Sequence, residues 1–320
     1  MKSWLITGGT GSFGKAFTRK LLDGGAERVV ILSRDELKQA EMRKEFNDDR
    51  LRFFIGSVID MDRVELAMQG VSHVVHAAAM KRVEVCEENP REAVATNLIG
   101  TSVVAEACRR AGVKRCVFLS TDKAAAPNTL YGMTKASAER LWCRANVYSA
   151  GTDTRFAATR YGNVLGSRGS VVPIFRAQAR LGGPLTITEP EATRFWMTMD
   201  EACQLVAKAF RAMRGGEVFI PKVGSSAVGE LAHAIAPGMA WKIGQLGAGE
   251  KLHETLISEE EARATYDYGD HYRIEPQRTW ETKEDGMHAV EGTQVPPGFV
   301  YRSDTNPDRL DPIGLVRLVA

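Results

Sequence analysis

The sequence lacks the features that would tie it to a membrane or to nucleic acid. Its 320 residues carry a formal net charge of +2, which argues against a protein that binds nucleic acid by charge. It contains no run of about 20 apolar residues of the kind that spans a bilayer. No secretory signal is visible, because "MKSWLITGG" leads directly into a predicted strand. We therefore expect a soluble, cytoplasmic protein.

Cysteine is scarce and unpaired. The chain has five cysteines, with no CxxC pair and no histidine partner at zinc spacing. An odd, scattered set indicates buried thiols in a reducing compartment, and we expect no metal site. The five are Cys86, Cys108, Cys116, Cys143 and Cys203.

The first half of the chain alternates short apolar runs with helical patterns. Strands that are apolar along their whole length predict a parallel sheet covered on both faces, so the fold class is α/β, a doubly wound sheet of the Rossmann type. A sixth strand is predicted at Thr154–Val164. The other predicted strands are Ser3–Gly9, Arg28–Arg34, Arg52–Ser57, His73–Ala79 and Arg115–Thr121, and the helical segments are Phe13–Leu22, Asp35–Phe46, Asp60–Gln69 and Pro90–Ala111.

After Val164 the alternation of strands and helices becomes less regular, because glycines, prolines and short polar runs are frequent. An amphipathic helix at Asp200–Arg214 and a strand at Glu217–Pro221, which we expect to return to the main sheet, interrupt this region. We predict a cofactor domain of residues 1–164 plus about 195–222. A smaller, mixed α/β substrate domain is predicted from about 165–194 plus 223–265, and residues 266–320 form a C-terminal extension of open role.

The stretch "ITGGTGSFGK" matches the pattern T-G-x-x-G-x-x-G, with glycines at Gly8, Gly11 and Gly14. Glycines let the turn tighten and let a pyrophosphate approach the N-terminus of a helix, where unpaired N–H groups favour an anion. The motif follows the first predicted strand and opens a helix, which is the context of a dinucleotide site. We therefore predict that the chain binds a nicotinamide dinucleotide.

The end of the second predicted strand is where NAD and NADP are distinguished. Ser33 and Arg34 come first and favour a 2′-phosphate, whereas Asp35 is well placed to cap the next helix, with Lys38 close behind. We expect NADP, and NAD is the open alternative.

Tyr131 and Lys135 lie one helical turn apart in "YGMTK", after the fifth predicted strand. A phenol with a pKa near 10 is a poor base at neutral pH, and a neighbouring ammonium lowers that pKa by favouring the phenolate. Such a pair takes a proton from an alcohol while hydride leaves for nicotinamide. Thr121 is placed to hydrogen-bond the same alcohol oxygen.

Several longer motifs carry a closer resemblance. "SRDELKQAEMRKEFND", "HAAAMKRV", "LSTDKAAAPNTLYGMTK", "RYGNVLGSRGSVVPIF", "TRFWMT", "GGEVFIPK" and "GEKLHE" are similar to those of the inverting UDP-N-acetylglucosamine 4,6-dehydratases. This family of the extended short-chain dehydrogenase/reductase superfamily begins the pathway to pseudaminic acid and related bacterial surface sugars. The resemblance covers the chain from the first strand to about Ser258. It implies NADP, a nucleotide-sugar substrate and homo-oligomers, either dimers or ring-like hexamers.

The resemblance also implies a mechanism. Tightly held NADP oxidises C4 of the sugar, a base removes the C5 proton, water leaves C6, and hydride returns to C6. Tyr131 and Lys135 then serve the oxidation, Lys123 takes the C5 proton and returns it on the opposite face, and Asp122 is the acid for the departing hydroxyl. Because a lysine base must be partly neutral, we expect the pKa of Lys123 to be lowered by burial and by Lys135 or the oxidised cofactor.

The resemblance places further residues in the site. The implied substrate contacts are Lys81, Asn163, Arg194 and Glu250, with Glu250 near the uridine. The implied cofactor contacts, beyond the three glycines, Tyr131 and Lys135, are Thr10, Ser12, Phe13, Ser33, Arg34, Asp35, Lys38, Ser57, Val58, Ala77, Lys81 and Asn97. His73 and His76 lie on a predicted buried strand and are expected to be core residues.

Three positions depart from the family pattern. Gly247 stands where an arginine usually precedes "PGEK" and would fork onto the diphosphate. Ser57 replaces an acidic residue that meets the adenine, and Ala126 replaces an asparagine next to Lys123. These departures bear chiefly on the identity of the substrate.

Three alternatives stay open. A nucleotide-sugar 4-epimerase shares the cofactor site and the Tyr131–Lys135 pair, but it needs no acid and base for C5 and C6, so Asp122 and Lys123 argue against it. A retaining 4,6-dehydratase acting on another nucleotide sugar would differ in its stereochemistry at C5. A non-catalytic NADP-sensing protein would have little reason to keep Thr121, Tyr131 and Lys135 together.

Overall fold

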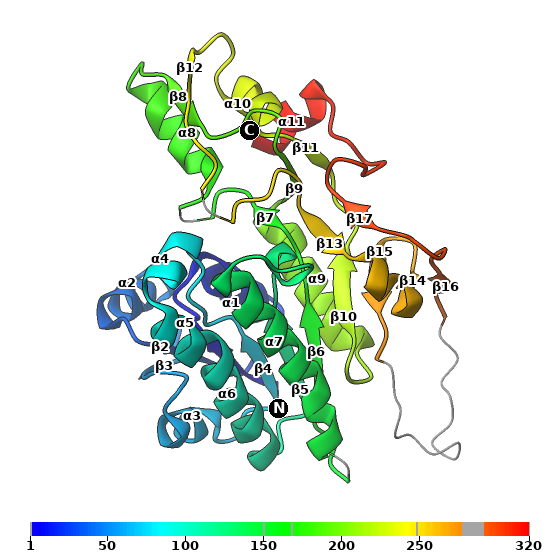
Figure 1. Cartoon of the computed structure of the whole chain (residues 1–320). Coiled ribbons are helices and arrows are strands. Elements are labelled where there is room, and N and C mark those ends of the chain that lie inside the picture. The colour runs from blue at the N-terminus through cyan, green and yellow to red at the C-terminus, as the bar shows by residue number, and fades with distance from the viewer. Residues whose placement is uncertain (1, 150, 168, 248, 277–290, 320) are drawn as a thin grey trace.

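The core of the computed structural model, which describes residues 2–149, 151–167, 169–247, 249–276 and 291–319, is a ten-stranded sheet (Figure 1). Seven neighbouring strands are parallel, in the order β3-β2-β1-β4-β5-β6-β10, which confirms the predicted doubly wound α/β fold. The returning strand was also predicted correctly, because β10 pairs with β6. These strands are β1 (Ser3–Thr7), β2 (Arg28–Ser33), β3 (Leu51–Ile55), β4 (His73–His76), β5 (Arg115–Leu119), β6 (Arg155–Thr159) and β10 (Val218–Pro221).

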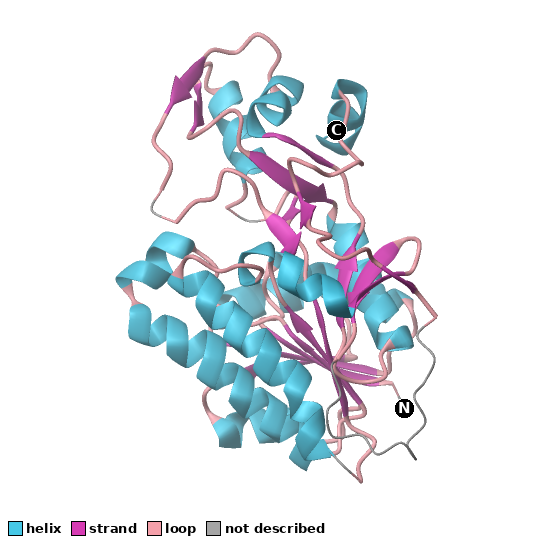
Figure 2. Ribbon diagram, turned by 45° about the vertical axis from the view of Figure 1, so that its right-hand side comes forward, coloured by secondary structure: helices cyan, strands magenta, loops and turns pink. Residues whose placement is uncertain are grey.

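Helices cover both faces of this sheet (Figure 2). On one face α1 packs against α9, and on the other α6 packs against both α3 and α7. The short helices α4 and α5 lie beside α7. The bounds are α1 (Ser12–Asp23), α2 (Glu36–Phe46), α3 (Met61–Met68), α4 (Val83–Glu88), α5 (Pro90–Val94), η1 (Ala95–Ile99, a π-turn), α6 (Gly100–Arg110), η2 (Asp122–Ala124), α7 (Leu130–Arg144), η3 (Ala145–Ser149) and α9 (Met199–Ala212).

Aromatic side chains fill the core on both faces of the sheet. Trp4 of β1 contacts Phe210 of α9 edge to face, and His73 of β4 stacks on Trp4. Three residues along the same strand, His76 points to the opposite face and stacks on Trp142 of α7. Both histidines are therefore core residues, as predicted.

A second lobe lies above the main sheet in Figures 1 and 2. It contains the three-stranded sheet β11-β9-β7 and the β8–β12 pair, packed against three helices. We expected the cofactor domain to resume near residue 195, but that position lies inside β9, which pairs with β7 and β11; only from α9 onward does the chain rejoin the main sheet. The elements are β7 (Asn163–Val164), α8 (Val171–Arg180), β8 (Leu185–Ile187), β9 (Thr193–Met197), β11 (Ser225–Ala227), α10 (Val228–Ile235), β12 (Trp241–Ile243) and α11 (Pro312–Val319).

The described part of the C-terminal extension contributes to both lobes. Strands β15, β14 and β16 extend the main sheet antiparallel beyond β10, whereas α11 packs on α10 in the second lobe. The remaining elements are β13 (Thr255–Ile257), η4 (Glu259–Ala264), β14 (Thr265–Asp267), β15 (His271–Ile274), β16 (Thr293–Gln294) and β17 (Tyr301–Arg302). In the part of the chain that the structure describes, no helix combines the length and the apolar character needed to cross a membrane.

Candidate active site

The predicted dinucleotide turn connects β1 to the N-terminus of α1. Gly8 has a φ of +66°, and a Cβ at this position would lie 2.9 Å from the backbone of Ala78. At Gly14 a Cβ would lie 2.3 Å from the carbonyl oxygen of Gly9, so only glycine fits there. The N-cap of α1 is Gly11, which has no side chain to close off the helix N–H groups. This cradle fits a pyrophosphate, and Thr10, Ser12 and Phe13 lie within the same turn.

At the end of β2, the structure gives the contacts of the polar residues that were predicted to bind the cofactor. Asp35 caps α2: its Oδ1 accepts a hydrogen bond from the Lys38 amide at 3.0 Å, as predicted, and its Oδ2 pairs with Lys38 Nζ. Ser33 Oγ accepts a hydrogen bond from Gln39. The Arg34 side chain is 59% exposed and lies 3.4 Å from Glu92. The arginine is therefore the residue at this strand end that faces solvent.

Buried hydrogen bonds fix the loop that follows β4. Thr7 Oγ1 accepts hydrogen bonds from the amides of Ala77 and Ala78, and it lies 2.6 Å from His76 Nδ1. Burial lowers the pKa of His76 to about 3, so the ring is neutral at physiological pH. The loop is thereby held against Gly8, beside the predicted cofactor turn.

Asn97 was predicted to contact the cofactor, and the structure gives its side chain protein partners. Its Oδ1 accepts a hydrogen bond from the Met80 amide at 2.8 Å. Its Nδ2 donates to the Met80 carbonyl at 3.0 Å and to Thr134 Oγ1 at 3.1 Å. The carboxamide thus anchors the loop that carries Lys81, whose pKa is lowered by burial, to α7. Of the remaining predicted contacts, Ser57 and Val58 follow β3, and Val58 is buried.

Tyr131 and Lys135 lie on the first turns of α7, and both are buried. Lys135 Nζ donates a hydrogen bond to the Leu119 carbonyl at 2.6 Å and lies 3.8 Å from the centre of the Phe118 ring. Burial lowers the pKa of Lys135 to about 7, with a small opposing effect of Glu139.

The expectation of a lowered tyrosine pKa is wrong for this structure. Burial raises the pKa of Tyr131 to about 12, and it outweighs the hydrogen bond with Thr121 and the charge of Lys123, which both lower the pKa. The reason is that Lys135 Nζ is bonded to Leu119 and is itself close to neutral, so it does not supply the expected ammonium. The charged lysine that acts on the phenol is Lys123.

The residues Thr121 to Lys123 follow β5 and form the start of η2. Asp122 Oδ1 accepts a hydrogen bond from Thr121 Oγ1 at 2.9 Å and lies 3.2 Å from Lys123 Nζ. The side chain of Lys123 is 30% exposed, whereas that of Asp122 is 2% exposed. The lysine side chain is therefore partly exposed, whereas the carboxylate is buried.

Glu254, which follows "GEKLH", lies on the other side of Lys123 and was missed in the sequence. Its Oε1 is 3.0 Å from Lys123 Nζ, and its side chain is 3% exposed. Burial lowers the pKa of Lys123, but the charges of Asp122 and Glu254 outweigh that effect and raise the pKa above its ordinary value. The expectation of a lowered pKa is therefore wrong, because two buried carboxylates hold the lysine as an ammonium.

Two of the residues predicted for substrate binding, Arg194 and Glu250, lie at the same junction. Arg194 of β9 pairs with Glu250 at 3.2 Å, and its Nε lies 3.9 Å from Glu254. Asn163 of β7 is paired in register with Trp196 of β9. The structure thus brings Arg194 and Glu250 together beside Lys123.

A family model described as polysaccharide biosynthesis protein matches residues 4–276. The chain belongs to this family. An inverting UDP-N-acetylglucosamine 4,6-dehydratase of Campylobacter jejuni (strain 81-176) is 46% identical over 312 residues, which cover 96% of this chain and 93% of that protein. This likeness confirms the resemblance given by the motifs. A UDP-glucose 4-epimerase of Rickettsia canadensis is 41% identical over 281 residues, 85% of this chain and 82% of the other.

Solved structures agree with this assignment to the polysaccharide biosynthesis family. The X-ray structure of Pen from Bacillus thuringiensis has a TM-score of 0.90 at 33% identity, covering 99% of this chain and 98% of that one. The dTDP-glucose 4,6-dehydratase DesIV of Streptomyces venezuelae, solved with NAD bound, has a TM-score of 0.70 at 26% identity, over 78% of this chain and 86% of that one. These likenesses support a nicotinamide cofactor, and they do not distinguish NAD from NADP.

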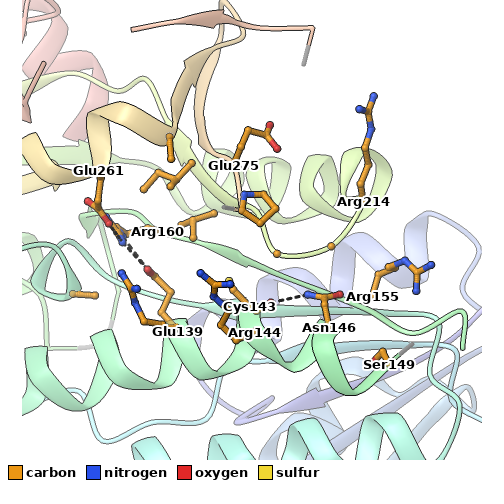
Figure 3. Close-up of a pocket in the computed structure, with 18 of the residues that line it drawn as sticks. Glu139, Cys143, Arg144, Asn146, Ser149, Arg155, Arg160, Arg214, Glu261 and Glu275 are labelled. Carbon is orange, nitrogen blue, oxygen red and sulfur yellow. Dashed lines mark hydrogen bonds and ion pairs between the residues drawn. The ribbon is translucent and has the colours of Figure 1, made fainter. Parts of the chain in front are cut away.

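The structure has a cavity that lies away from the predicted catalytic and substrate-binding residues. It has a volume of about 850 Å³ and opens beside the C-terminal half of α7 (Figure 3). Arg160 forms one of its walls, bonded to Glu139 of α7 and to Glu261 of η4. The cavity is lined by the far end of α7 and by η4, whereas Tyr131 and Lys135 lie at the beginning of that helix. The predicted active-site residues Lys123 and Tyr131 do not line this cavity.

Proposed function

We propose that the chain is an NADP-dependent nucleotide-sugar 4,6-dehydratase that acts on UDP-N-acetylglucosamine and inverts C5. The observation that carries this proposal is the group of acidic and basic side chains around Lys123, next to Thr121 and Tyr131. Oxidation of an alcohol needs only a tyrosine–lysine pair. A second acid and base beside that pair suit the removal of a proton and a hydroxyl from neighbouring carbons.

The side chains divide the work as follows. Tyr131, with Thr121, holds the C4 oxygen, and it accepts the proton of that hydroxyl in its phenolate form, which the charge of Lys123 favours. Lys123, whose side chain is the most exposed of the group, takes the C5 proton and returns it on the opposite face, and Asp122 passes a proton from the Lys123 ammonium to the leaving hydroxyl. The bound nicotinamide supplies the oxidation at C4 and the reduction at C6.

NADP rather than NAD is supported by the end of β2. Asp35 caps α2 and pairs with Lys38, whereas the Arg34 side chain is the more exposed of the two, at 59% against 39%. A guanidinium forks onto phosphate oxygens in paired hydrogen bonds. We expect Arg34→Ala to weaken NADP binding roughly tenfold, as expected for a lost charged contact of about 1.4 kcal/mol, and to leave NAD binding unchanged in calorimetric titrations. Equal loss for both cofactors would contradict the assignment.

Arg194 and Glu250 would meet the nucleotide end of the substrate, with Asn163 and Lys81 nearer the sugar. Gly247, where the family pattern has an arginine, donates its amide to Glu250 Oε2 at 3.2 Å. Arg194 is the guanidinium beside this turn, so we propose that it takes over the diphosphate contact. The cytoplasmic location, the pathway to pseudaminic acid and a dimeric or hexameric assembly are further predictions from the resemblance.

A time course by NMR with UDP-N-acetylglucosamine in deuterated buffer tests the function. We expect a 4-keto-6-deoxy product that carries deuterium at an inverted C5 in the wild type and no such product with Lys123→Ala. Retention of configuration at C5 would contradict the inverting assignment. Turnover of a different nucleotide sugar alone would contradict the assigned substrate.

The second candidate is a nucleotide-sugar 4-epimerase, which the 41% identity to the Rickettsia canadensis protein favours. The same NMR experiment separates the two functions, because an epimerase forms the C4 epimer without loss of water and without exchange at C5. In that case Lys123→Ala would retain turnover.

A further inference from the structure

Glu254 is held rigidly at the junction of the two lobes. Its amide donates a hydrogen bond to Ser303 Oγ at 2.9 Å, and its carbonyl accepts one from the Ser303 amide at 2.9 Å. Ser303 Oγ in turn lies 2.7 Å from Thr193 Oγ1, at the start of β9. The backbone therefore fixes where the Glu254 carboxylate lies, 3.0 Å from Lys123 Nζ.

One oxygen of that carboxylate has no protein partner. Glu254 Oε2 is buried and accepts no hydrogen bond from any of the described residues, and the same holds for Asp122 Oδ2. Two buried carboxylates thus flank one ammonium, with Arg194 3.9 Å from Glu254. A buried acceptor without a donor costs free energy, and protonation of that carboxylate would reduce the cost.

This arrangement bears on how Lys123 works as a base. A base must be neutral before it takes a proton, but the carboxylates stabilise the ammonium form of Lys123. Two acceptors lie within reach of Nζ, Asp122 Oδ1 at 3.2 Å and Glu254 Oε1 at 3.0 Å. Asp122 Oδ1 already accepts the Thr121 hydroxyl, whereas burial and the charge of Asp122 raise the pKa of Glu254. Glu254 is the better acceptor.

We propose that Glu254 is a positioning residue that holds Lys123 Nζ and accepts one of its protons at Oε1, so that the lysine reaches the C5 proton as a neutral amine. The transfer turns an ammonium and a carboxylate into an amine and a carboxylic acid, and the net charge of the pair is unchanged. The amine then takes the C5 proton. The electron pair of the C5–H bond forms the C5–C6 double bond, and the C6 hydroxyl leaves as water with a proton that Asp122 Oδ1 receives from the Lys123 ammonium, 3.2 Å away.

A bound sugar would favour this transfer by excluding water from Lys123. The side chain of Lys123 is the most exposed of the group, at 30%, so a ligand that covers the group would remove solvent from that side chain. Desolvation disfavours the charged forms of both a lysine and a glutamate, and it therefore favours the neutral pair. The proposal rests on the proposed dehydratase function, because it concerns removal of the C5 proton.

The test is the rate of deuterium incorporation at C5 from UDP-N-acetylglucosamine, measured in single turnovers between pH 6 and 9. We expect a nearly flat profile for the wild type, because the proton moves within the pair. In Glu254→Gln, Lys123 must lose its proton to solvent. The rate should then be about a thousandfold lower at pH 7, because only about one ordinary lysine in a thousand is a neutral amine at that pH. It should rise about tenfold for each pH unit.

Two further variants and one binding control complete this experiment. Glu254→Asp keeps a proton acceptor and should keep the flat profile at a reduced rate. Glu259→Gln, at an exposed acid of η4, should match the wild type and controls for the loss of one negative charge nearby. Glu254→Gln must also bind NADP like the wild type, which shows that the fold is intact; if it does not bind, Glu254→Asp alone carries the test through its profile.

The outcomes separate the two proposals. A wild type that incorporates no deuterium at C5 contradicts the proposed function. If the wild type does exchange, a Glu254→Gln variant with wild-type rates overturns the role of Glu254 alone. A slow variant with a flat profile also overturns it, because the residue would then only orient Lys123. A sloped profile for Glu254→Asp has the same consequence.

Discussion

Replacing Lys135 by methionine should make the cofactor-free protein more stable at neutral pH. Burial lowers the pKa of Lys135 from 10.5 to about 7. The unfolded chain therefore keeps this proton up to about pH 10.5, and the folded protein releases it above about pH 7. Between these values the unfolded state binds more protons, so stability rises with pH, and it is lowest where Lys135 is charged in both states.

The magnitude follows from this difference in proton binding. Each tenfold difference in acidity corresponds to about 1.4 kcal/mol, so burying the lysine costs about 4 kcal/mol at pH 7 and about 1 kcal/mol at pH 10. Methionine removes that cost but also the hydrogen bond to the Leu119 carbonyl, a loss of about 1–3 kcal/mol. Lys135→Met should thus be about 1–3 kcal/mol more stable than the wild type at pH 7, and the two stabilities should cross near pH 9.

Urea unfolding at pH 6, 7, 8, 9 and 10 measures this difference, since all other titrating groups are common to both proteins. The matched control is Lys44→Met, at an exposed lysine of α2, whose stability should follow the wild type at every pH. A Lys135→Met variant that is less stable than the wild type at pH 7 and changes with pH in parallel to it would refute the reasoning. It would mean that Lys135 is not desolvated in the folded protein.

Three smaller changes have outcomes that the backbone determines. Gly14→Ala places a Cβ 2.3 Å from the Gly9 carbonyl oxygen and should weaken dinucleotide binding roughly a hundredfold by calorimetry, since overpacking costs about 1–3 kcal/mol; wild-type affinity would contradict this. Ala126→Gly relieves a φ of +47° and should raise the free energy of unfolding in urea by about 0.5–1 kcal/mol, and a decrease would count against strain at this loop. Thr129→Ala removes the side chain that caps α7 by accepting the Gly132 amide at 3.1 Å, and should lower that free energy by about 1 kcal/mol; Thr129→Ser should retain most of it, and equal losses in both would refute the cap.

The parts of the site that were predicted from the sequence depend on local geometry. Gly8 and Gly14 occupy positions where a Cβ would collide with backbone, and the spacing of the motif already implied this. Asp35 caps α2 because it directly precedes the helix. Tyr131 and Lys135 lie on the same helix, so their separation of one turn also followed from the sequence. In each case the interacting atoms are within a few residues of one another along the chain.

What could not be predicted depends on contacts between distant segments. Glu254 meets Lys123 across 131 residues, and no local pattern marks that pairing. The protonation states were wrong for the same reason. Tyr131 is buried against Cys86 and Ala93, about 40 residues earlier in the chain, and Glu254 reaches Lys123 only when the lobes pack together. These contacts reverse the shifts that a tyrosine–lysine pair and a buried lysine suggest on their own. The limit of the second lobe near β9 also depended on pairing with β7 and β11.

The division of the site between the lobes distinguishes the two halves of the proposed reaction. Tyr131, Lys135 and their bonds to Thr121 and Leu119 belong to the main sheet and α7. The charge state of Lys123 depends on Glu254, which is fixed to β9 through Ser303. The protonation of Lys123 in the proposed loss of water thus depends on a contact between the two lobes.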